Sequence, residues 1–373
     1  MKLKRLCISC GGTGGHFYPG LAVARIFKEQ GGEVLLILGG KHADEQIKTA
    51  EKFGIPARKI AASPLSARPG GALKFFRDAL KGTLECRRIY RHFFPEALLA
   101  MGSFASFPPI LAAKWKRVPL FLHDGNAKLG KTNRRLSRLA SGMALSFPTK
   151  DETNCKCPPV LTGMPLRPEL IRGKMTKDAA IAELNQRWQC QFSADIPTIL
   201  IFGGSLGAAS INDNCRIPLY YQEKEVQLIH LSGAGKAEEL KEYYKEASFN
   251  HLILESAQDM QIFYSAADWI VCRAGGSTVS EVACFGKYAT LIPYPFAAQD
   301  HQTDNALYLT PSGGAELIPD KDLAAGLFAD RLRDFLADPA LYQKKGEQLL
   351  ALAFPDAAER VLNMIDSIVY PQE

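Results

Sequence analysis

The 373-residue sequence lacks the segments that would anchor it in a membrane or export it. No apolar run approaches the ~20 residues that a membrane-spanning helix needs. The basic start, MKLKRLCISCGGTGG, has only a few apolar residues before a glycine cluster, which is too short for the core of a signal peptide. We therefore expect a cytoplasmic protein.

Closely spaced cysteines are few. Among nine cysteines, the only near neighbours are Cys7 with Cys10 and Cys155 with Cys157. Cys7 and Cys10 fall in an expected strand, where a spacing of three residues directs side chains to opposite faces. We interpret them as buried apolar packing rather than as a metal or redox pair. No metal site and no cofactor are expected.

Acidic residues are scarce in the first 160 positions, which hold 27 Lys and Arg but 11 Asp and Glu, a net charge of +16. The remaining residues hold 18 and 28, a net charge of −10. This asymmetry predicts an anionic partner for the first half: nucleic acid, acidic phospholipid or a phosphorylated substrate. Basic and aromatic residues alternate over 73–94 and again over 114–117, which favours an anionic membrane surface.

Apolar, strand-like segments alternate with helical patterns along the whole chain. In the first half the expected strands are 3–10, 33–40, 97–104, 118–124 and 142–147, with a helix over 19–30. The alternation of strand-like and helical segments begins again at TILIFGGSLGAASIND (198–213). It continues with expected strands at 226–235, 251–256, 268–276 and 288–295. Alternation of this kind predicts parallel sheets covered by helices on both faces.

The sequence therefore predicts an α/β protein with two Rossmann-like domains. The proline-rich stretch CKCPPVLTGMPLRPEL falls near the boundary and is interpreted as a linker. Pro355 separates two helices near the C-terminus, and we expect the last helix to cross back to the first domain. The expected domains are 1–163 with about 355–373, and 164–354.

Three glycine-rich turns precede expected helices. The first is Gly11 to His16 and the second is Gly203 to Gly207; both allow backbone N–H groups to approach a phosphate. Dinucleotide binding is disfavoured, because Phe17 stands where a third glycine is needed and no acidic residue closes the second strand. The third turn opens RAGGSTVSE (273–281), in which the Glu281 carboxylate can accept two hydroxyl hydrogen bonds from a ribose.

The stretch HDGNAKLGKT (123–132) contains the spacing G-x-x-x-x-G-K-T of a phosphate-binding P-loop. A P-loop follows the leading strand of its domain and needs an aspartate at another strand end to hold Mg²⁺. Here the match falls late in the first domain, and the preceding strands end in AMGSF, LGG and CGG. An NTPase is therefore disfavoured, although the spacing leaves that alternative open.

Six separated motifs together resemble one family. They are GGTGGHFYPGLAVA, GSFASFPPILAAKWKRVPLFLHDGNAKLGKTNRRLSRLA, TGMPLR, GGSLGAASIN, CRAGGSTVSEVACFG and DHQTDNA. In this order they resemble the MurG family of UDP-N-acetylglucosamine transferases, which complete lipid II. The resemblance covers nearly the whole chain. It implies a GT-B fold in which two Rossmann-like domains face an interdomain cleft, the donor lying mainly in the second and the lipid acceptor mainly in the first.

The resemblance also implies roles for individual residues of the donor site. Glu281 would hold the ribose, the backbone of Ala257 would meet the uracil, and Gln302 would read the GlcNAc hydroxyls. The diphosphate would face Ser205 and the turn formed by Gly276, Ser277, Thr278, Val279 and Ser280. Further donor and cleft contacts would come from Thr13, Gly14, Gly15, Asn126 and Arg167.

The implied reaction moves GlcNAc from UDP-GlcNAc to the C4 hydroxyl of the MurNAc in undecaprenyl-linked lipid I, with inversion. A base must accept the hydroxyl proton. His16 in the first glycine turn is the candidate, and Asp124 is the alternate. Helix N-termini and backbone amides would stabilise the departing charge, so no metal is expected. Glycosyltransferases that use a metal carry an Asp-x-Asp motif, which we interpret as missing from this sequence.

The sequence departs from the family pattern at two places. His123-Asp124-Gly125-Asn126 replaces the usual His-Glu-Gln-Asn loop, and Leu206 replaces the usual glutamine of the second glycine turn. Other readings stay open here: a GT-B enzyme with a different acceptor, a UDP-GlcNAc 2-epimerase, or a nucleotide- or nucleic-acid-binding module. The implied partners are UDP-GlcNAc, lipid I and the anionic inner face of the plasma membrane, with no nucleic acid.

Overall fold

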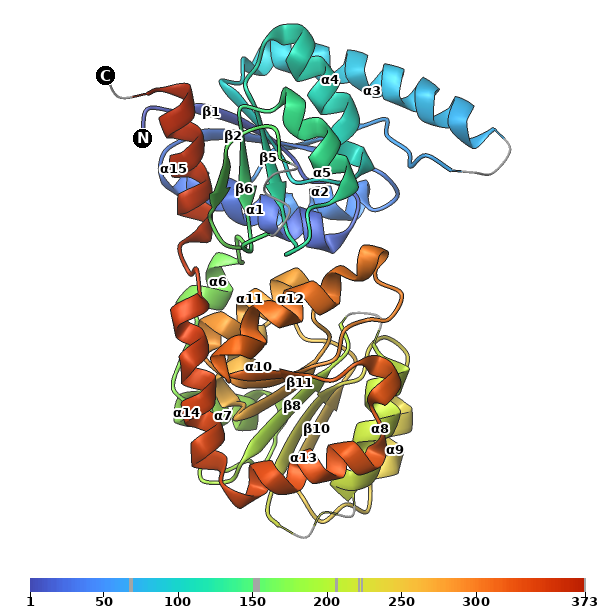
Figure 1. Ribbon diagram of the computed structural model, residues 1–373, viewed down its shortest axis with the longest axis vertical. Helices are drawn as coiled ribbons and strands as arrows, with labels where there is room; N and C mark the ends of the chain where they lie inside the picture. The colour runs from blue at the N-terminus through green and yellow to red at the C-terminus, as the bar shows by residue number, and fades with distance from the viewer. Residues whose placement is uncertain (67–69, 150–154, 205–206, 221, 223, 372–373) are drawn as a thin grey trace. The chain divides into compact units, whose positions relative to one another are not determined.

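The structure is a computed structural model that describes residues 1–66, 70–149, 155–204, 207–220, 222 and 224–371. The chain forms two compact units (Figure 1). The first unit comprises Met1–Pro168 and Phe354–Glu373, and the second comprises Glu169–Ala353. Each unit contains a parallel sheet with helices against it. Within the described ranges, no helix is both long and apolar enough to cross a bilayer.

The sheet of the first unit has seven parallel strands in the order β3-β2-β1-β4-β5-β6-β7. The strands are β1 Arg5–Ser9, β2 Glu33–Gly39, β3 Ala57–Ile60, β4 Ala97–Ala100, β5 Leu120–Asp124, β6 Gly142–Leu145 and β7 Pro159–Leu161. The helices are α1 Gly14–Glu29, α2 Ala43–Lys52, α3 Gly71–Phe93, α4 Phe107–Lys116, α5 Lys131–Leu136 and the C-terminal α15 Ala357–Val369. The short helix α6 Pro168–Arg172 begins where this unit ends.

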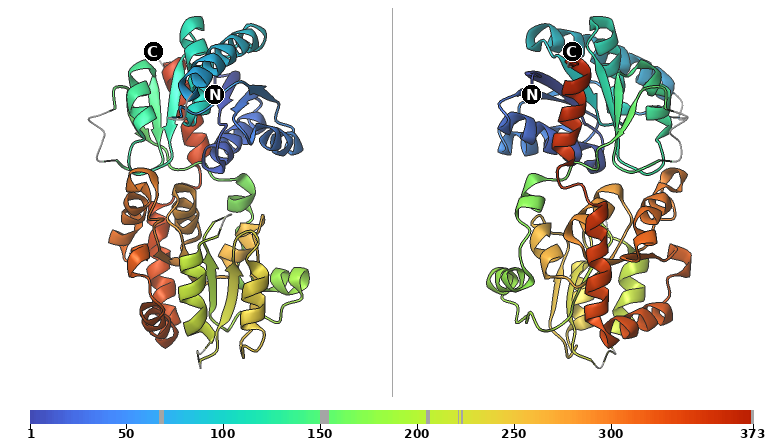
Figure 2. Two further views of the ribbon diagram at one scale, coloured as in Figure 1. Left: turned by 90° about the vertical axis from the view of Figure 1, so that its right-hand side faces the viewer. Right: turned by 60° about the vertical axis from the view of Figure 1, so that its left-hand side comes forward.

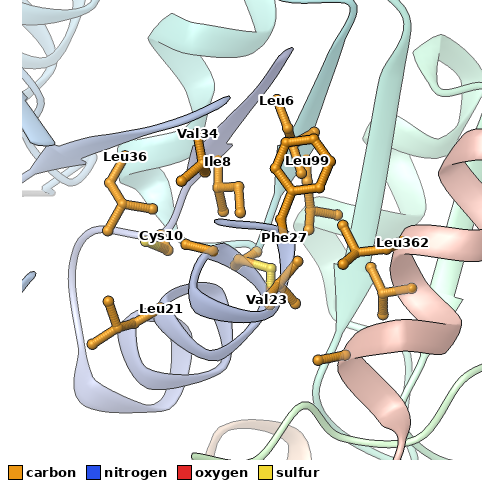
Figure 3. Packing of buried hydrophobic residues seen from close by; sticks show 14 of the residues in the cluster. Leu6, Ile8, Cys10, Leu21, Val23, Phe27, Val34, Leu36, Leu99 and Leu362 are labelled. Atoms are coloured by element: carbon orange, nitrogen blue, oxygen red, sulfur yellow. The ribbon is translucent and has the colours of Figure 1, made fainter. Parts of the chain in front are cut away.

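Helices α1 and α15 cover one face of this sheet (Figures 2 and 3). Phe27 of α1 and Leu362 of α15 pack in the same buried cluster as Leu6 and Leu99 from the central strands. The last helix therefore returns to the first unit, as the sequence predicts. Helices α3 and α4 supply the opposite core. Cys10 lies in the first cluster and Cys7 in the second, which confirms that the two thiols occupy opposite faces.

The second unit repeats this design with six parallel strands in the order β10-β9-β8-β11-β12-β13. The strands are β8 Thr198–Phe202, β9 Gln227–Leu231, β10 His251–Leu254, β11 Trp269–Cys272, β12 Tyr288–Leu291 and β13 Ala315–Leu317. The helices are α7 Lys177–Trp188, α8 Ala209–Tyr220, α9 Ala237–Tyr244, α10 Met260–Ala266, α11 Gly276–Phe285, α12 His301–Leu309, α13 Ala325–Ala337 and α14 Pro339–Glu347. In both sheets the first three strands run outward from the centre and the fourth returns to pair with the first, the arrangement of Rossmann-like folds.

The structure differs from the sequence-based expectation at several elements. Helix α1 begins at Gly14 rather than at residue 19, so that Pro19 lies inside it. Part of the expected linker is strand β7, an edge strand that starts with Pro159. An edge position tolerates proline because one side of the strand needs no ladder hydrogen bonds. The short edge strands β3 and β13 were also missed, because each contains polar residues and no apolar run.

Two histidines are buried inside the sheets. His123 lies in β5 with 2% of its surface exposed, and His230 lies in β9 with none exposed. Burial lowers the pKa of each imidazole to about 3, with a smaller contribution from His16 at His123. Both histidines are therefore neutral in the folded protein at neutral pH.

We predict that these histidines make the free energy of unfolding fall as the pH drops from 7 to 5. Below pH 6.5 the unfolded chain binds protons that the folded imidazoles exclude, and each site costs up to ~1.4 kcal/mol per pH unit. Urea unfolding at pH 7, 6 and 5 measures the slope. His230→Gln should reduce the slope, whereas His42→Gln, at an exposed site, should keep it. A His230 imidazole that titrates near pH 6.5 by NMR would contradict the prediction.

Candidate active site

The first glycine turn connects strand β1 to helix α1 through very close backbone contacts. A Cβ atom on Gly11 would lie 2.4 Å from the backbone nitrogen of Gly39. Gly12 has a φ of +108°, and a Cβ there would lie 2.5 Å from the Ser103 hydroxyl oxygen. Only glycine fits both positions. The absence of side chains here lets α1 begin directly at the carboxyl edge of the sheet.

The N-terminus of α1 is open to an anion. Thr13 is its N-cap but makes no side-chain capping hydrogen bond, and the first turn contains no acidic residue. Thr13, Gly14 and Gly15 are exposed. The first-turn N–H groups of a helix have no partner within the helix and carry partial positive charge, so this end suits a phosphate or an oxyanion.

His16 stands at the same helix end and is half-buried. Its Nδ1 is 2.8 Å from the Thr13 hydroxyl, and the Nε2 edge of the ring lies against Gly102. Gly102 has a φ of +93°, and a Cβ there would come within 3.2 Å of His16 Nε2. Burial lowers the pKa of His16, which keeps the imidazole neutral at pH 7. When Nδ1–H donates to Thr13, Nε2 carries the lone pair that a general base needs.

Asp124 ends strand β5 and is buried. Its Oδ2 accepts hydrogen bonds from the Gly130 backbone N–H at 2.9 Å and the Asn133 side-chain amide at 3.0 Å, and its Oδ1 accepts the Asn126 N–H at 3.3 Å. The carboxylate thus occupies backbone amides that a phosphate would use in a P-loop. The helix that follows, α5, has only six residues. Backbone N–H groups of the P-loop-like stretch are therefore hydrogen-bonded to the protein's own carboxylate, that of Asp124.

Two further candidates of the first unit lie at this carboxyl edge. Asn126 belongs to the loop that Asp124 holds. The Arg167 guanidinium is 5.9 Å from the centre of the Tyr18 ring, and a Cβ on Gly14 would contact the same ring at 3.5 Å. The structure therefore brings Arg167 close to the N-terminus of α1. His123 lies behind His16 in the sheet, where its Nε2 is 3.1 Å from the Ser146 hydroxyl.

In the second unit, α11 begins directly after strand β11 through the turn at Ala274 and Gly275. Gly275, its N-cap residue, provides no side-chain capping bond, and the first turn contains no acidic residue. Gly276, Ser277, Thr278 and Ser280 are partly exposed, whereas Val279 is buried in the core. The α11 N-terminus therefore has the same anion-binding character as that of α1.

Glu281 lies one turn further along α11 and is half-buried. The hydroxyl of Tyr264 donates a hydrogen bond to its Oε2 at 2.8 Å. Tyr264 is fully buried in α10, and its ring stacks on Phe285 with centres 5.0 Å apart. This hydrogen bond fixes the direction of the carboxylate, and a carboxylate is a group that can accept hydrogen bonds from paired hydroxyls.

The expected sugar-reading loop leads into α12. The Gln302 side-chain oxygen accepts the Tyr294 backbone N–H at 2.9 Å, and the amide of Asn305, which is fully buried, donates to the Ala274 carbonyl at 3.1 Å. This second bond ties α12 to the turn before α11. Ala257 lies, half-buried, in the turn between β10 and α10. Ser205 lies outside the described residues.

Asp320 and Asp322 have the Asp-x-Asp spacing used by metal-dependent glycosyltransferases, so the interpretation that this motif is missing from the sequence is wrong. Asp320 forms a salt bridge with Arg273 and accepts a hydrogen bond from the Ser210 hydroxyl at 2.6 Å. Its carboxylate thus connects α8 to the strand end of β11. Among the residues described, no group of three His, Cys, Asp or Glu side chains is arranged to hold a metal ion.

Several residues that shape the site were missed in the sequence. Arg273 and Asn305 lie within quoted motifs, RAGGSTVSE and DHQTDNA, so a signal was present but their contacts were not evident. Tyr264 lies in an ordinary apolar helix, QIFYSA, and nothing in the sequence indicates its bond to a residue 17 positions away. Such contacts exist only once neighbouring strands place their helices side by side.

Comparison with known proteins agrees with this architecture. Residues 6–145 match the glycosyltransferase family 28 N-terminal domain, and residues 198–361 match the glycosyltransferase family 28 C-terminal domain. The chain is similar to two proteins called UDP-N-acetylglucosamine–N-acetylmuramyl-(pentapeptide) pyrophosphoryl-undecaprenol N-acetylglucosamine transferase. The one from Thermodesulfovibrio yellowstonii is 31% identical over 98% of this chain and 99% of its own. The one from Geobacter sulfurreducens is 34% identical over 96% and 97%.

A crystal structure of MurG from Acinetobacter baumannii superimposes with a TM-score of 0.77 and 28% identity, covering 98% of this chain and 99% of that one. The match therefore extends over both units. The chain belongs to the MurG family of glycosyltransferase family 28.

Proposed function

We propose that this protein transfers GlcNAc from UDP-GlcNAc to the C4 hydroxyl of the MurNAc in undecaprenyl-linked lipid I, which yields lipid II for peptidoglycan synthesis. The proposal rests on the geometry of helix α11. Its N-terminus has no side-chain cap, and Glu281 follows one turn later, held by Tyr264. One helix therefore offers N–H donors for a diphosphate and a carboxylate for the ribose next to it.

Family membership and this geometry support the assignment of donor residues. Glu281 binds the ribose hydroxyls, and the turn of Gly276, Ser277, Thr278, Val279 and Ser280 faces the diphosphate with Ser205. The side chain of Val279 packs in the core beneath this turn. Ala257 contacts the uracil through its backbone, and Gln302 reads the sugar hydroxyls. In the first unit, Thr13, Gly14, Gly15, Asn126 and Arg167 contact the sugar nucleotide and the acceptor.

His16 acts as the general base in this proposal. The acceptor O4 forms a bond to C1 of GlcNAc as the bond from C1 to the diphosphate breaks, His16 Nε2 takes the hydroxyl proton, and UDP leaves with the bonding electrons. Attack opposite the leaving group inverts the configuration at C1. Asp124, the alternate base, already accepts three hydrogen bonds from its own loop, and we assign it the role of holding that loop.

The decisive assay follows radiolabelled GlcNAc from UDP-GlcNAc into a lipid I analogue. His16→Ala should lower kcat by ~10²–10⁴-fold, because general base catalysis contributes about that much. The dissociation constant for UDP-GlcNAc should change little. His42→Ala, at an exposed histidine of the same unit, is the matched control. Unchanged turnover in His16→Ala would remove the role from His16 and make Asp124 the base to test.

The same assay separates the proposed transfer from other activities. Formation of an epimerised UDP-sugar without acceptor would indicate a 2-epimerase instead. Labelled product with a diacylglycerol acceptor but not with the lipid I analogue would indicate a different lipid glycosyltransferase. If ATP but not UDP protected the protein from thermal unfolding, the result would favour the alternative that the protein is a P-loop NTPase.

We predict that Tyr264→Phe weakens UDP binding by about tenfold, because it removes a hydrogen bond to a carboxylate. The phenyl ring keeps the stacking on Phe285, so the fold should be unaffected. Isothermal titration calorimetry with UDP measures the effect, and Tyr243→Phe, in α9 of the same unit, is the control. If Tyr264→Phe bound UDP as tightly as the parent protein, Glu281 would not depend on Tyr264 for its position.

We further propose that the first unit docks on the anionic inner face of the plasma membrane through α3. Three apolar residues of α3 follow one another at helical spacing and are largely exposed: Leu73 (76%), Phe76 (65%) and Leu80 (63%). Lys74, Arg77 and Lys81 alternate with them. Trp115 of α4 is 60% exposed, and the Arg87 guanidinium lies 3.4 Å from the centre of its ring. Apolar residues mixed with cations suit an anionic lipid surface.

The triple variant Leu73→Gln, Phe76→Gln and Leu80→Gln should lose most binding to vesicles that contain anionic phospholipid. Cosedimentation measures this, with neutral vesicles and high salt as comparisons. Leu341→Gln, at an exposed leucine of the second unit, should bind as the parent protein does. Transfer to a water-soluble acceptor should be unchanged in the triple variant. Equal cosedimentation of the triple variant and the parent would refute the role of α3.

A further inference from the structure

Three sulfur atoms meet at the edge of the first sheet. The Sγ atoms of Cys155 and Cys157 are 3.6 Å apart, and Cys155 Sγ is 4.0 Å from the Sδ of Met143. Cys157 and Met143 are buried, whereas Cys155 is partly exposed. Met143 is the second residue of β6, and the two cysteines lie just before β7, which pairs with β6 through Met143 and Pro159. The pairing of these strands thus brings the sulfurs together.

The geometry suits an ion with three sulfur ligands. An ion ~2.3 Å from each of three coplanar sulfurs holds them about 4.0 Å apart, which is close to both measured separations. The residue between the cysteines is fixed, because the Lys156 N–H donates to the Ser137 hydroxyl at 3.0 Å, and that hydroxyl donates to the Arg134 carbonyl at 2.8 Å.

The donor set selects the type of metal. Thiolate and thioether ligands prefer soft ions such as Cu(I), whereas structural zinc takes four ligands from Cys, His or carboxylates. Within the described part of the chain, no third His, Cys, Asp or Glu joins these two cysteines as a metal-binding group.

We propose that Cys155, Cys157 and Met143 form a binding site for monovalent copper that is separate from the transferase site. One Cu(I) ion binds two thiolates and one thioether, and two thiol protons are released to solvent. The Cys155 thiol, which donates to the Cys157 carbonyl at 3.1 Å, gives up that bond when the ion binds. The site lies at the amino end of β7, whereas His16 and Asp124 lie at the carboxyl ends of their strands.

The test is an anaerobic competition between the full-length protein and a chromophoric Cu(I) chelator. The parent protein should retain about one equivalent of copper, and Cys155→Ser/Cys157→Ser should retain none. Met143→Leu, which conserves volume, should weaken retention about tenfold. Cys190→Ser, at a partly exposed thiol of the second unit, is the control and should behave as the parent does. X-ray absorption should show three sulfur ligands.

Several outcomes would overturn the proposal. One is equal copper retention by the parent and the double variant, which would place the ion on other cysteines. Unchanged retention in Met143→Leu would exclude the thioether, and zinc binding as tight as copper binding would exclude a soft-metal site. The single variant Cys155→Ser changes a partly exposed residue, so its result can be interpreted even if Cys157→Ser impairs folding.

Discussion

Both units depend on how closely a strand-to-helix turn can approach the backbone of its neighbours. A Cβ on Gly11 would lie 2.4 Å from the Gly39 nitrogen, and one on Gly203 would lie 2.4 Å from the nitrogen of Ala208. A side chain at either position would push the following helix away from the edge of the sheet. With glycine, the N-termini of α1 and α8 lie directly at that edge. The N–H groups at the start of a helix in this position suit an anion.

Carboxylates of the protein are kept away from the N-termini of α1 and α11 and form hydrogen bonds elsewhere. Neither α1 nor α11 has an acidic residue in its first turn. Asp124 instead satisfies the amides of its own loop, and Asp320 pairs with Arg273. Glu281 lies further along α11, where Tyr264 holds it. The N-terminal turns of both helices therefore keep their partial positive charge, and the carboxylate proposed to bind the ribose lies one turn away from the N-terminus of α11.

The sequence predicted most of this architecture for identifiable reasons. Strands such as β2 and β8 are continuous apolar runs because both faces of a parallel sheet are buried. The motifs around His16 and Glu281 contain glycines at fixed spacing, which makes the turns visible. The short edge strands β3, β7 and β13 were missed because an edge strand needs neither an apolar run nor a full set of N–H donors. The start of α1 was misplaced because Pro19 was taken as its first residue.

The sequence by itself determined the two Rossmann-like units, the basic first half and the family, because burial patterns and glycine turns are local in the chain. Tertiary structure decided which groups act on one another. Strand pairing brings together the residues of three such interactions. They are the hydrogen bond from Tyr264 to Glu281, the electrostatic effect of His16 on the buried His123, and the hydrogen bond from the Gly130 N–H to Asp124. A spacing such as G-x-x-x-x-G-K-T specifies which atoms are present. The folded backbone decides whether a phosphate or a neighbouring carboxylate binds them.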